Sequence, residues 1–282
     1  MNKFIWCLPT ICGLLLSAFP QVRDGSVGVV YYSDDKLVMA ADSRGTTTDG
    51  IVPTNTECKV AAFNNKLVFV STGAVEYGRN ERIRIIPDIV QPWSNVDEAR
   101  NAFSSATLTS NLVYNTALRW GNAVAGHWNF LHLFNPDKVR AAVARNGALT
   151  GSLTVALFGG IDGDGRLRLV ETTVDFNDFA LVPITATTKP VSCIQSWCAI
   201  GAIEIVLDFL NQTSDQAKQE MIQWGRQQWP AGDAELLKAI RLVDLTIAYH
   251  IGDDVGPPID ALELRRDGSF RWFARKDNCP AD

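Results

Sequence analysis

Residues 25–74 contain four short apolar runs separated by polar turns, and this pattern constrains the fold more than any other feature of the sequence. The runs read VGVVYY, KLVMAAD, CKVAAF and KLVFVSTG, and they are rich in β-branched and aromatic residues. The segments between them are SDD, SRGTTTDG and NN, whose Asp, Asn and Gly residues favour tight turns. The stretch therefore predicts four strands joined as hairpins. Ser26, Asp42 and Lys59 stand at ends of three of these strands, and Gly73 closes the fourth.

The rest of the chain alternates between helical and extended patterns. Apolar residues at helical spacing, preceded by polar capping residues, predict helices. We expect helices over residues 95–120, 136–145, 202–210 and 214–229, and a last one that Asp233 caps and that runs at least to Ile247. Ser94 or Asn95 is the expected cap of the first of these helices, and Thr213 or Ser214 that of the fourth. We expect extended runs over residues 152–161, 166–176, 179–184, 259–264 and 270–274. Pattern alone thus predicts a mixed α+β protein with antiparallel hairpins.

Composition narrows the classes of partner. The chain has 282 residues, of which 46% are hydrophobic and 20% are charged, as in ordinary globular proteins. Its net charge of -5 argues against nucleic acid or an anionic membrane as the partner. His127, His132 and His250 are too scattered in the sequence for a metal site, so we expect neither a metal nor a cofactor.

The N-terminus resembles a targeting segment. Lys3 supplies a positive charge, and residues 4–19 form an almost unbroken apolar stretch that is too short for a comfortable membrane span. We therefore expect a cleaved signal peptide, with Ala18 as a candidate cleavage position, and a secreted or extracytoplasmic protein. An uncleaved anchor or an apolar N-terminal helix are the alternatives. No second long apolar run follows, so we expect no other membrane contact.

The cysteine count agrees with export. Removal of the signal leaves an even number of cysteines, Cys58, Cys193, Cys198 and Cys279. Four cysteines allow three disulfide connectivities, and Cys193 and Cys198 are close enough to form a small local loop. Buried free thiols are the alternative.

Four motifs in the first stretch resemble the N-terminal half of proteasome β-type subunits, which are N-terminal-nucleophile (Ntn) hydrolases. The matching pieces are residues 25–26, 38–44, 58–60 and 72–74, and only the loop between Asp42 and Lys59 is longer, by about one residue. The resemblance implies an α+β fold, a four-layer αββα sandwich with two antiparallel sheets between helical layers. It also implies a signal and leader over residues 1–25 and a single domain over residues 26–282.

The same resemblance implies an amidohydrolase or peptidase that acts on a peptide or a small amide. It also leads us to expect that copies of this chain associate as a homo-oligomer. Self-cleavage between Gly25 and Ser26 would leave Ser26 as an N-terminal nucleophile whose own amine is the base. Lys59 would lower the pKa of that amine, Asp42 would orient Lys59, and the Gly73 N–H would stabilise an oxyanion. From the residues alone, Ser26 can equally be the first residue of a strand. Asp42 and Lys59 can be a structural ion pair, and Gly73 a turn residue.

The sequence departs from the family's pattern at two places. Ala202 and Ile203 stand where the family has a supporting Ser, and residues 252–258 lack a second one, although Asp253 or Asp254 can supply the acidic group found there. Because such groups position the amine and its water, their loss bears on turnover more than on the fold. A non-catalytic protein of the same fold, acting in binding or assembly, is therefore the alternative function.

Overall fold

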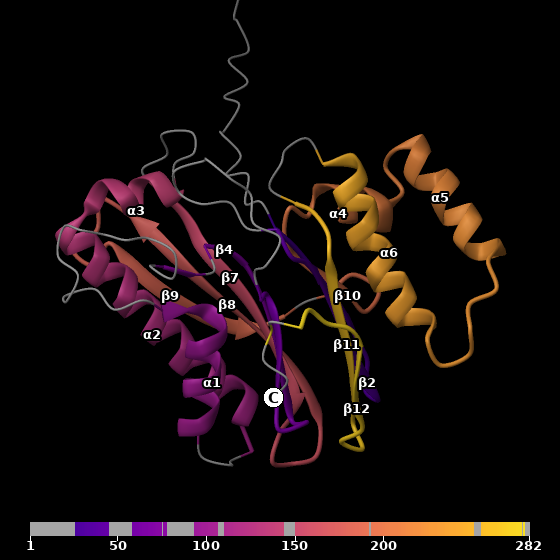
Figure 1. Cartoon of the computed structure of the whole chain (residues 1–282), viewed down its shortest axis with the longest axis horizontal. Helices are drawn as coiled ribbons and strands as arrows, with labels where there is room; N and C mark the ends of the chain where they lie inside the picture. Colours follow the sequence, from indigo (N-terminus) through magenta and orange to yellow (C-terminus); the bar gives the residue numbers. More distant parts are fainter. Residues whose placement is uncertain are drawn as a thin grey trace, which may run out of the picture.

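The computed structural model describes residues 26–44, 58–74, 76–77, 93–106, 110–143, 150–191, 193–250, 255–277 and 279. Its elements are shown in Figure 1. The strands are β1 (Val27–Tyr32), β2 (Lys36–Asp42), β3 (Val60–Phe63), β4 (Leu67–Gly73), β5 (Glu76–Tyr77), β6 (Trp93–Ser94), β7 (Thr150–Ile161), β8 (Leu167–Asn177), β9 (Ile184–Pro190), β10 (Trp197–Gly201), β11 (Ile259–Arg265) and β12 (Phe270–Ala274). The helices are α1 (Asn95–Ser105), α2 (Leu112–Phe134), α3 (Pro136–Val143), α4 (Glu204–Asn211), α5 (Asp215–Arg226) and α6 (Ala234–Tyr249).

The longer strands form two antiparallel sheets of five strands each. The first sheet has the order β10-β1-β2-β11-β12, and the second has the order β3-β4-β7-β8-β9. Strands β5 and β6 pair with each other. The predicted hairpins β1–β2, β3–β4, β7–β8 and β11–β12 are all confirmed. The described chain is thus mixed α+β, with two antiparallel sheets and six helices.

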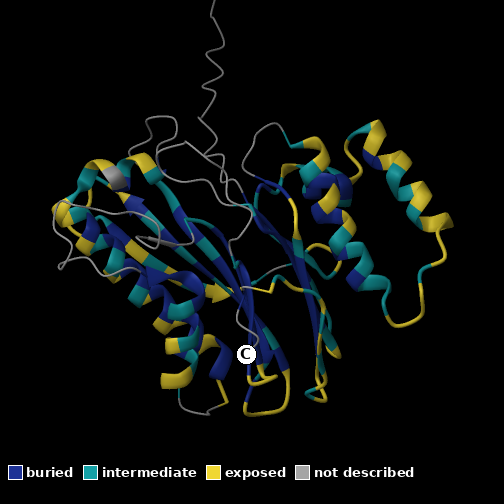
Figure 2. Ribbon diagram, in the orientation of Figure 1, coloured by how far each residue is buried: buried dark blue, intermediate teal, exposed yellow. Residues whose placement is uncertain are grey.

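Strands that are apolar on both faces explain where the core lies. Along β2, Leu37 and Met39 belong to a cluster shared by the two sheets, whereas Val38 and Ala40 belong to a cluster shared with α4 and α6. This period of two is what a pleated strand with two buried faces requires. On the second sheet, Phe69 packs against Trp120 of α2. Figure 2 shows the sheets largely buried, with exposed residues on the helices and at the hairpin turns.

The predicted helix caps are confirmed where the sequence offers Ser. Ser94 accepts a hydrogen bond from Asp97 N in the first turn of α1, and Ser214 accepts one from Ala217 N in α5. Each bond satisfies an N–H that has no partner inside the helix. Asp233 precedes α6 as predicted, but its side chain makes no capping bond.

The single helix predicted over residues 95–120 is wrong. Two helices, α1 and α2, replace it, and α2 continues beyond the predicted end to Phe134. Helical spacing also predicts Leu112, Tyr114 and Leu118 on one apolar stripe, but only Leu112 is buried, and Tyr114 and Leu118 are partly exposed. The buried face of α2 consists of Leu112, Val113, Thr116, Ala117, Trp120, Gly121, Val124, Ala125, Trp128 and Leu131. At Gly121 an added Cβ would lie 2.6 Å from Thr172 Cγ2, so the glycine allows α2 to approach β8 closely.

The extended run predicted over residues 179–184 is also wrong. β8 ends at Asn177, a turn follows, and β9 begins only at Ile184. Local hydrogen bonds explain the turn, since Asn177 accepts from Phe179 N and donates its own N–H to Pro183 O. In the part of the chain that the structure describes, no helix has the length and apolarity to cross a membrane. Residues 1–25, with the predicted signal and Gly25, lie outside the described residues, as do Asp253 and Asp254.

Candidate functional site

Asp42 is the centre of a buried polar cluster at the end of β2. Its Oδ1 accepts from Val27 N at 2.9 Å, and its Oδ2 accepts from Arg44 N at 3.1 Å and from Gly256 N at 3.2 Å. The side chain is completely buried. The carboxylate therefore joins the start of β1, the end of β2 and the segment that leads into β11.

Lys59 approaches this carboxylate from the other sheet. Its Nζ lies 3.1 Å from each carboxylate oxygen of Asp42, and it also donates to the Arg44 carbonyl. The Lys59 carbonyl accepts from Ser71 N at 2.9 Å, which ties the residue to β4. The predicted ion pair is therefore present, and it connects the two sheets. Burial raises the pKa of the Asp42 carboxyl above its ordinary value, and the positive charge of Lys59 opposes this rise.

Ser26 lies beside the ion pair, immediately before β1. It is buried, and its carbonyl accepts from Ala202 N at 2.7 Å. The next N–H in the chain, that of Val27, donates to the same Asp42 oxygen that contacts Lys59 Nζ. A single carboxylate oxygen therefore links the Ser26–Val27 peptide to the lysine.

Gly201 packs directly against the carbonyl group of Ser26. This residue was not assigned to the site from the sequence. Its φ is +84°, and a Cβ there would lie 1.8 Å from the Ser26 carbonyl oxygen. Only glycine combines this backbone conformation with so close an approach. The signal in the sequence is the Ala199-Ile200-Gly201 step, in which a glycine stands immediately before the helix expected over residues 202–210.

Gly73 ends β4 close to the same place. Its φ is +82°, and a Cβ would lie 2.6 Å from the Leu153 carbonyl oxygen, so glycine is required here as well. The preceding residue, Thr72, reaches the site, because its Cγ2 would lie 3.0 Å from a Cβ on Gly201. The structure thus brings Ser26, Asp42 and Lys59 together. Gly73 lies close to them, because the side chain of the preceding residue, Thr72, reaches the site. The Thr72 hydroxyl is buried and has no hydrogen-bond partner among the described residues.

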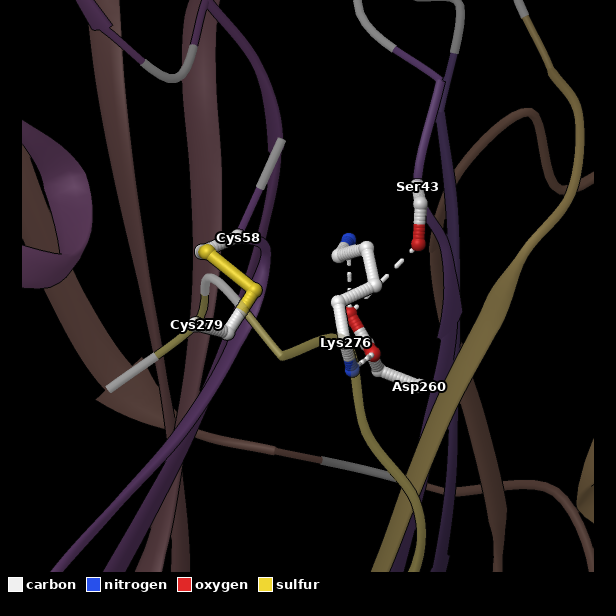
Figure 3. The surroundings of a disulfide bond; sticks show 5 residues. All are labelled: Ser43, Cys58, Asp260, Lys276 and Cys279. Carbon is white, nitrogen blue, oxygen red and sulfur yellow. Dashed lines mark hydrogen bonds and ion pairs between the residues drawn. A yellow bond between two sulfur atoms is a disulfide. The ribbon is translucent and has the colours of Figure 1, made fainter. Parts of the chain in front are cut away.

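A second buried ion pair, between Asp260 and Lys276, was not predicted from the sequence (Figure 3). Asp260 lies on β11 next to Ile259, which pairs with Asp42. Lys276 Nζ lies 2.7 Å from Asp260 Oδ2, and Lys276 N donates to Asp260 Oδ1 at 2.9 Å. Ser43, the residue after Asp42, points its hydroxyl at the same carboxylate, 3.4 Å from Oδ2. Asp260 and Lys276 are distant in the sequence from the motifs of the first stretch, so no local pattern indicated them.

The four cysteines among the described residues form two disulfides. Cys193 pairs with Cys198, which is the local loop that the sequence allowed, and Cys58 pairs with Cys279. Of the three connectivities, the structure has this one. The pairs are compatible with an extracytoplasmic location.

His127 and His132 make their contacts outside the cluster around Asp42. His127 contacts Glu98 at 3.1 Å and stacks on Trp93, and His132 lies 3.5 Å from Asp178. Within the described residues, no group of three or more His, Cys, Asp or Glu side chains could hold a metal ion.

Comparisons with known proteins give no family. No protein-family model matches the chain, and no curated protein matches it. Among solved structures, a Gly-1 mutant of Anbu from Hyphomicrobium sp. strain MC1 is 17% identical, with a TM-score of 0.42 over 90% of this chain and 89% of that one. Anbu (ancestral beta-subunit) from Yersinia bercovieri is 14% identical, with a TM-score of 0.48 over 87% of this chain and 86% of that one.

These comparisons correct the family assignment made from the sequence. The similar structures are Anbu proteins, a family distinct from the proteasome β-type subunits that the motifs resemble, and no family model matches. Assignment to the proteasome β-type subunit Ntn hydrolases is therefore wrong. Short motifs at hairpin ends misled the assignment, since turns and buried strands constrain residue type in many unrelated proteins. Similarity as low as that to the two Anbu structures carries no argument about this chain's activity.

Proposed function

We propose that this protein is an extracytoplasmic amide hydrolase, acting on peptides or small amides, with Ser26 as its nucleophile. One observation carries the proposal: a completely buried Lys59–Asp42 pair shares a carboxylate oxygen with the peptide that follows Ser26. Burial of two charges costs several kcal/mol, and a well-packed apolar pair would often be no less stable. A role in chemistry explains why such a costly pair lies beside a serine.

The proposed activation step is self-cleavage. The Ser26 hydroxyl oxygen attacks the Gly25 carbonyl carbon, and the proton of the hydroxyl passes to the Ser26 nitrogen as the C–N bond breaks. The leader is then held as an ester on Oγ, while the Ser26 nitrogen has become an amine. Water hydrolyses the ester, which releases the leader and leaves Ser26 as the first residue.

Turnover uses the amine that this step creates. The amine takes the proton of the Ser26 hydroxyl while Oγ attacks the substrate's carbonyl carbon, and the resulting ammonium gives this proton to the leaving nitrogen as the substrate's C–N bond breaks. Water then hydrolyses the acyl ester, which releases the acid and restores the Ser26 hydroxyl. The positive charge of Lys59 lowers the pKa of the amine, so that the neutral, basic form is available near neutral pH. Asp42 holds Lys59 in place through two contacts of 3.1 Å. The N–H of Gly73 is the proposed donor to the oxyanion.

The finer features of the fold belong to this proposal. The three core clusters lie between the sheets and under the helices on either side, which supports a four-layer αββα sandwich. Residues 26–282 would form one domain, and residues 1–25 would comprise the signal peptide and a short leader. The two disulfides support export. Association of the chain with copies of itself is part of the proposal and can be checked by its mass in solution.

The mature N-terminus tests the proposal. Intact mass and N-terminal sequencing of the wild-type protein should show a chain that begins at Ser26. The Ser26→Ala variant should keep the leader, because alanine has no hydroxyl to attack the Gly25 carbonyl. An aryl sulfonyl fluoride should label wild type at Ser26 and leave Ser26→Ala unlabelled.

Ser105→Ala is the matched control, since Ser105 is an exposed serine at the end of α1, remote from the site. It should be processed and labelled as wild type is. A folded wild-type protein whose chain starts upstream of Ser26 would contradict catalysis. That result would favour the alternative, a non-catalytic protein of this fold that acts in binding or assembly.

A further inference from the structure

We propose that the Cys58–Cys279 disulfide is a redox control on the candidate site, which becomes active only after this bond has formed. The inference rests on the proposed function, because it concerns regulation of the same Ser26 chemistry. It predicts that the precursor stays inactive in a reducing compartment and activates itself after export to an oxidising one.

The argument begins with the segment that follows β12, here called the C-terminal strap and comprising residues 275–277 and Cys279. The strap is anchored to the first sheet through Lys276, whose backbone N–H and side chain both bind the carboxylate of Asp260. Asp260 lies on β11 opposite Ala41 of β2, and the adjacent Ile259 lies opposite Asp42. Asp260, which binds the strap, is therefore adjacent on β11 to the residue that pairs with Asp42.

The other end of the strap is bound to the second sheet. Cys279 forms the disulfide with Cys58, and Cys58 is the residue immediately before Lys59. Figure 3 shows the disulfide and the Ser43–Asp260–Lys276 cluster side by side. The strap thus forms a covalent bridge between the sheets, with one end beside Asp42 and the other beside Lys59.

This bridge connects the same two sheets as the Lys59–Asp42 ion pair, on which the proposed chemistry depends. Lys59 belongs to the second sheet and Asp42 to the first, so any separation of the sheets at this end lengthens their contact. A buried ion pair contributes little net stability to hold the gap closed. The disulfide supplies the constraint, because Cys58 cannot move away from the strap while the S–S bond is intact.

Reduction removes this constraint in a balanced step. A dithiol reductant delivers two electrons and two protons to the Cys58–Cys279 bond, giving two thiols, and the reductant becomes a cyclic disulfide. Cys58 is partly exposed, which gives the reductant a route to the bond. Lys59 is then free to shift relative to Asp42 and Ser26. A displacement of about 1 Å in a catalytic arrangement can cost roughly 100-fold in rate.

The test isolates this disulfide by removing the other one. In the Cys193→Ala/Cys198→Ala variant, Cys58–Cys279 is the one remaining disulfide of the described chain. The rate of Ser26 labelling by the aryl sulfonyl fluoride is measured in oxidised protein, after dithiothreitol, and after reoxidation. We expect labelling to fall about 100-fold on reduction and to return on reoxidation. The Cys58→Ala/Cys279→Ala variant should label slowly whether or not dithiothreitol is present.

A second measurement reports on Lys59 without relying on catalysis. Acetylation by an N-hydroxysuccinimide ester, mapped by mass spectrometry, should spare buried Lys59 in oxidised protein and modify it after reduction. Lys66, exposed in the β3–β4 turn, is the internal reference. Near-ultraviolet circular dichroism, recorded below the unfolding transition of the reduced protein, should show that the fold persists.

The outcomes separate the two proposals. Equal labelling of oxidised and reduced protein, or a Lys59 that stays protected after reduction, overturns the redox control and leaves the proposed function intact. Loss of labelling together with the near-ultraviolet signal also overturns it, since the disulfide would then act on global stability alone. An oxidised protein that is neither processed nor labelled refutes the proposed function itself.

Discussion

At the scale of single residues, substitutions of Lys59 and Asp42 can separate the structural role of this ion pair from its proposed chemical role. Lys59→Ala alone would leave a buried carboxylate without its partner, which costs about 3–5 kcal/mol. An inactive variant would then be ambiguous. Lys59→Met combined with Asp42→Asn keeps the packing and removes both charges. We expect this double variant to fold but to remain unprocessed at Ser26 and unlabelled by the sulfonyl fluoride.

The single Lys59→Met variant has a characteristic pH dependence that serves as the control. Burial already raises the pKa of Asp42 above 3.8, and loss of Lys59 removes the group that opposes the rise. In the folded state Asp42 then binds its proton more tightly than in the unfolded state. Stability should therefore fall as pH rises from the unfolded pKa through the folded one. Urea unfolding measured across this pH range should show the fall in unfolding free energy for Lys59→Met but not for the double variant. The same pH profile for both variants would contradict this prediction.

At the scale of elements, the junction between β10 and β1 depends on Gly201. Gly201→Ala would place a side chain at φ +84° and against the Ser26 carbonyl, at 1.8 Å. The backbone strain alone costs about 1–3 kcal/mol, and the clash adds to it and displaces Ser26. We expect the Gly201→Ala variant to unfold at a lower urea concentration than backbone strain alone would cause. We also expect its Ser26 to lose labelling by the sulfonyl fluoride.

Gly268 offers a matched control for this junction. It has the same φ of +84°, but no atom lies within 4 Å of where its Cβ would be. Gly268→Ala should therefore show the backbone strain without the clash, and its Ser26 should be labelled as in wild type. If both variants lost the same stability and kept labelling, Gly201 would be a turn residue and not part of the site.

At the scale of the whole molecule, the two disulfides should differ greatly in their effect on stability. Cys58 and Cys279 are 221 residues apart, whereas Cys193 and Cys198 are 5 apart. On the chain-entropy view, the longer loop stabilises by about 3 kcal/mol more, because it restricts the unfolded chain more. Urea unfolding of Cys58→Ala/Cys279→Ala and of Cys193→Ala/Cys198→Ala measures this difference. Similar losses of unfolding free energy would contradict it.

Thiol titration supplies the necessary control for that comparison. The denatured mature protein should show no free thiol before reduction and four after it, from Cys58, Cys193, Cys198 and Cys279. Four free thiols without reductant would indicate that the protein matures in a reducing compartment, and would argue against both export and the redox control.

The sequence by itself determined the local elements of this protein. The hairpin from Val27 to Asp42 follows from two short apolar runs and a turn of Ser and Asp between them, and Ser94 and Ser214 begin helices by capping them. It also indicated the Asp42–Lys59 ion pair, since a lysine at the start of a buried strand requires an acidic partner. These inferences depend on neighbours in the chain, whose spacing is visible in the printed sequence.

Only the tertiary structure decided which distant residues meet. The spacing of Cys193 and Cys198 allowed their local loop, but nothing in the sequence around Cys58 and Cys279 shows that these two meet, or that Lys276 meets Asp260. The contact of Gly201 with Ser26 likewise needs β10 to pair with β1, where the paired residues Val27 and Gly201 are 174 positions apart in the sequence (201 minus 27). The sequence likewise gives no sign that Gly121 is buried, because its burial comes from the close fit of α2 against β8 and not from its own hydrophobicity. Such contacts depend on how sheets and helices pack together, a property that the spacing of residues along the chain does not encode locally.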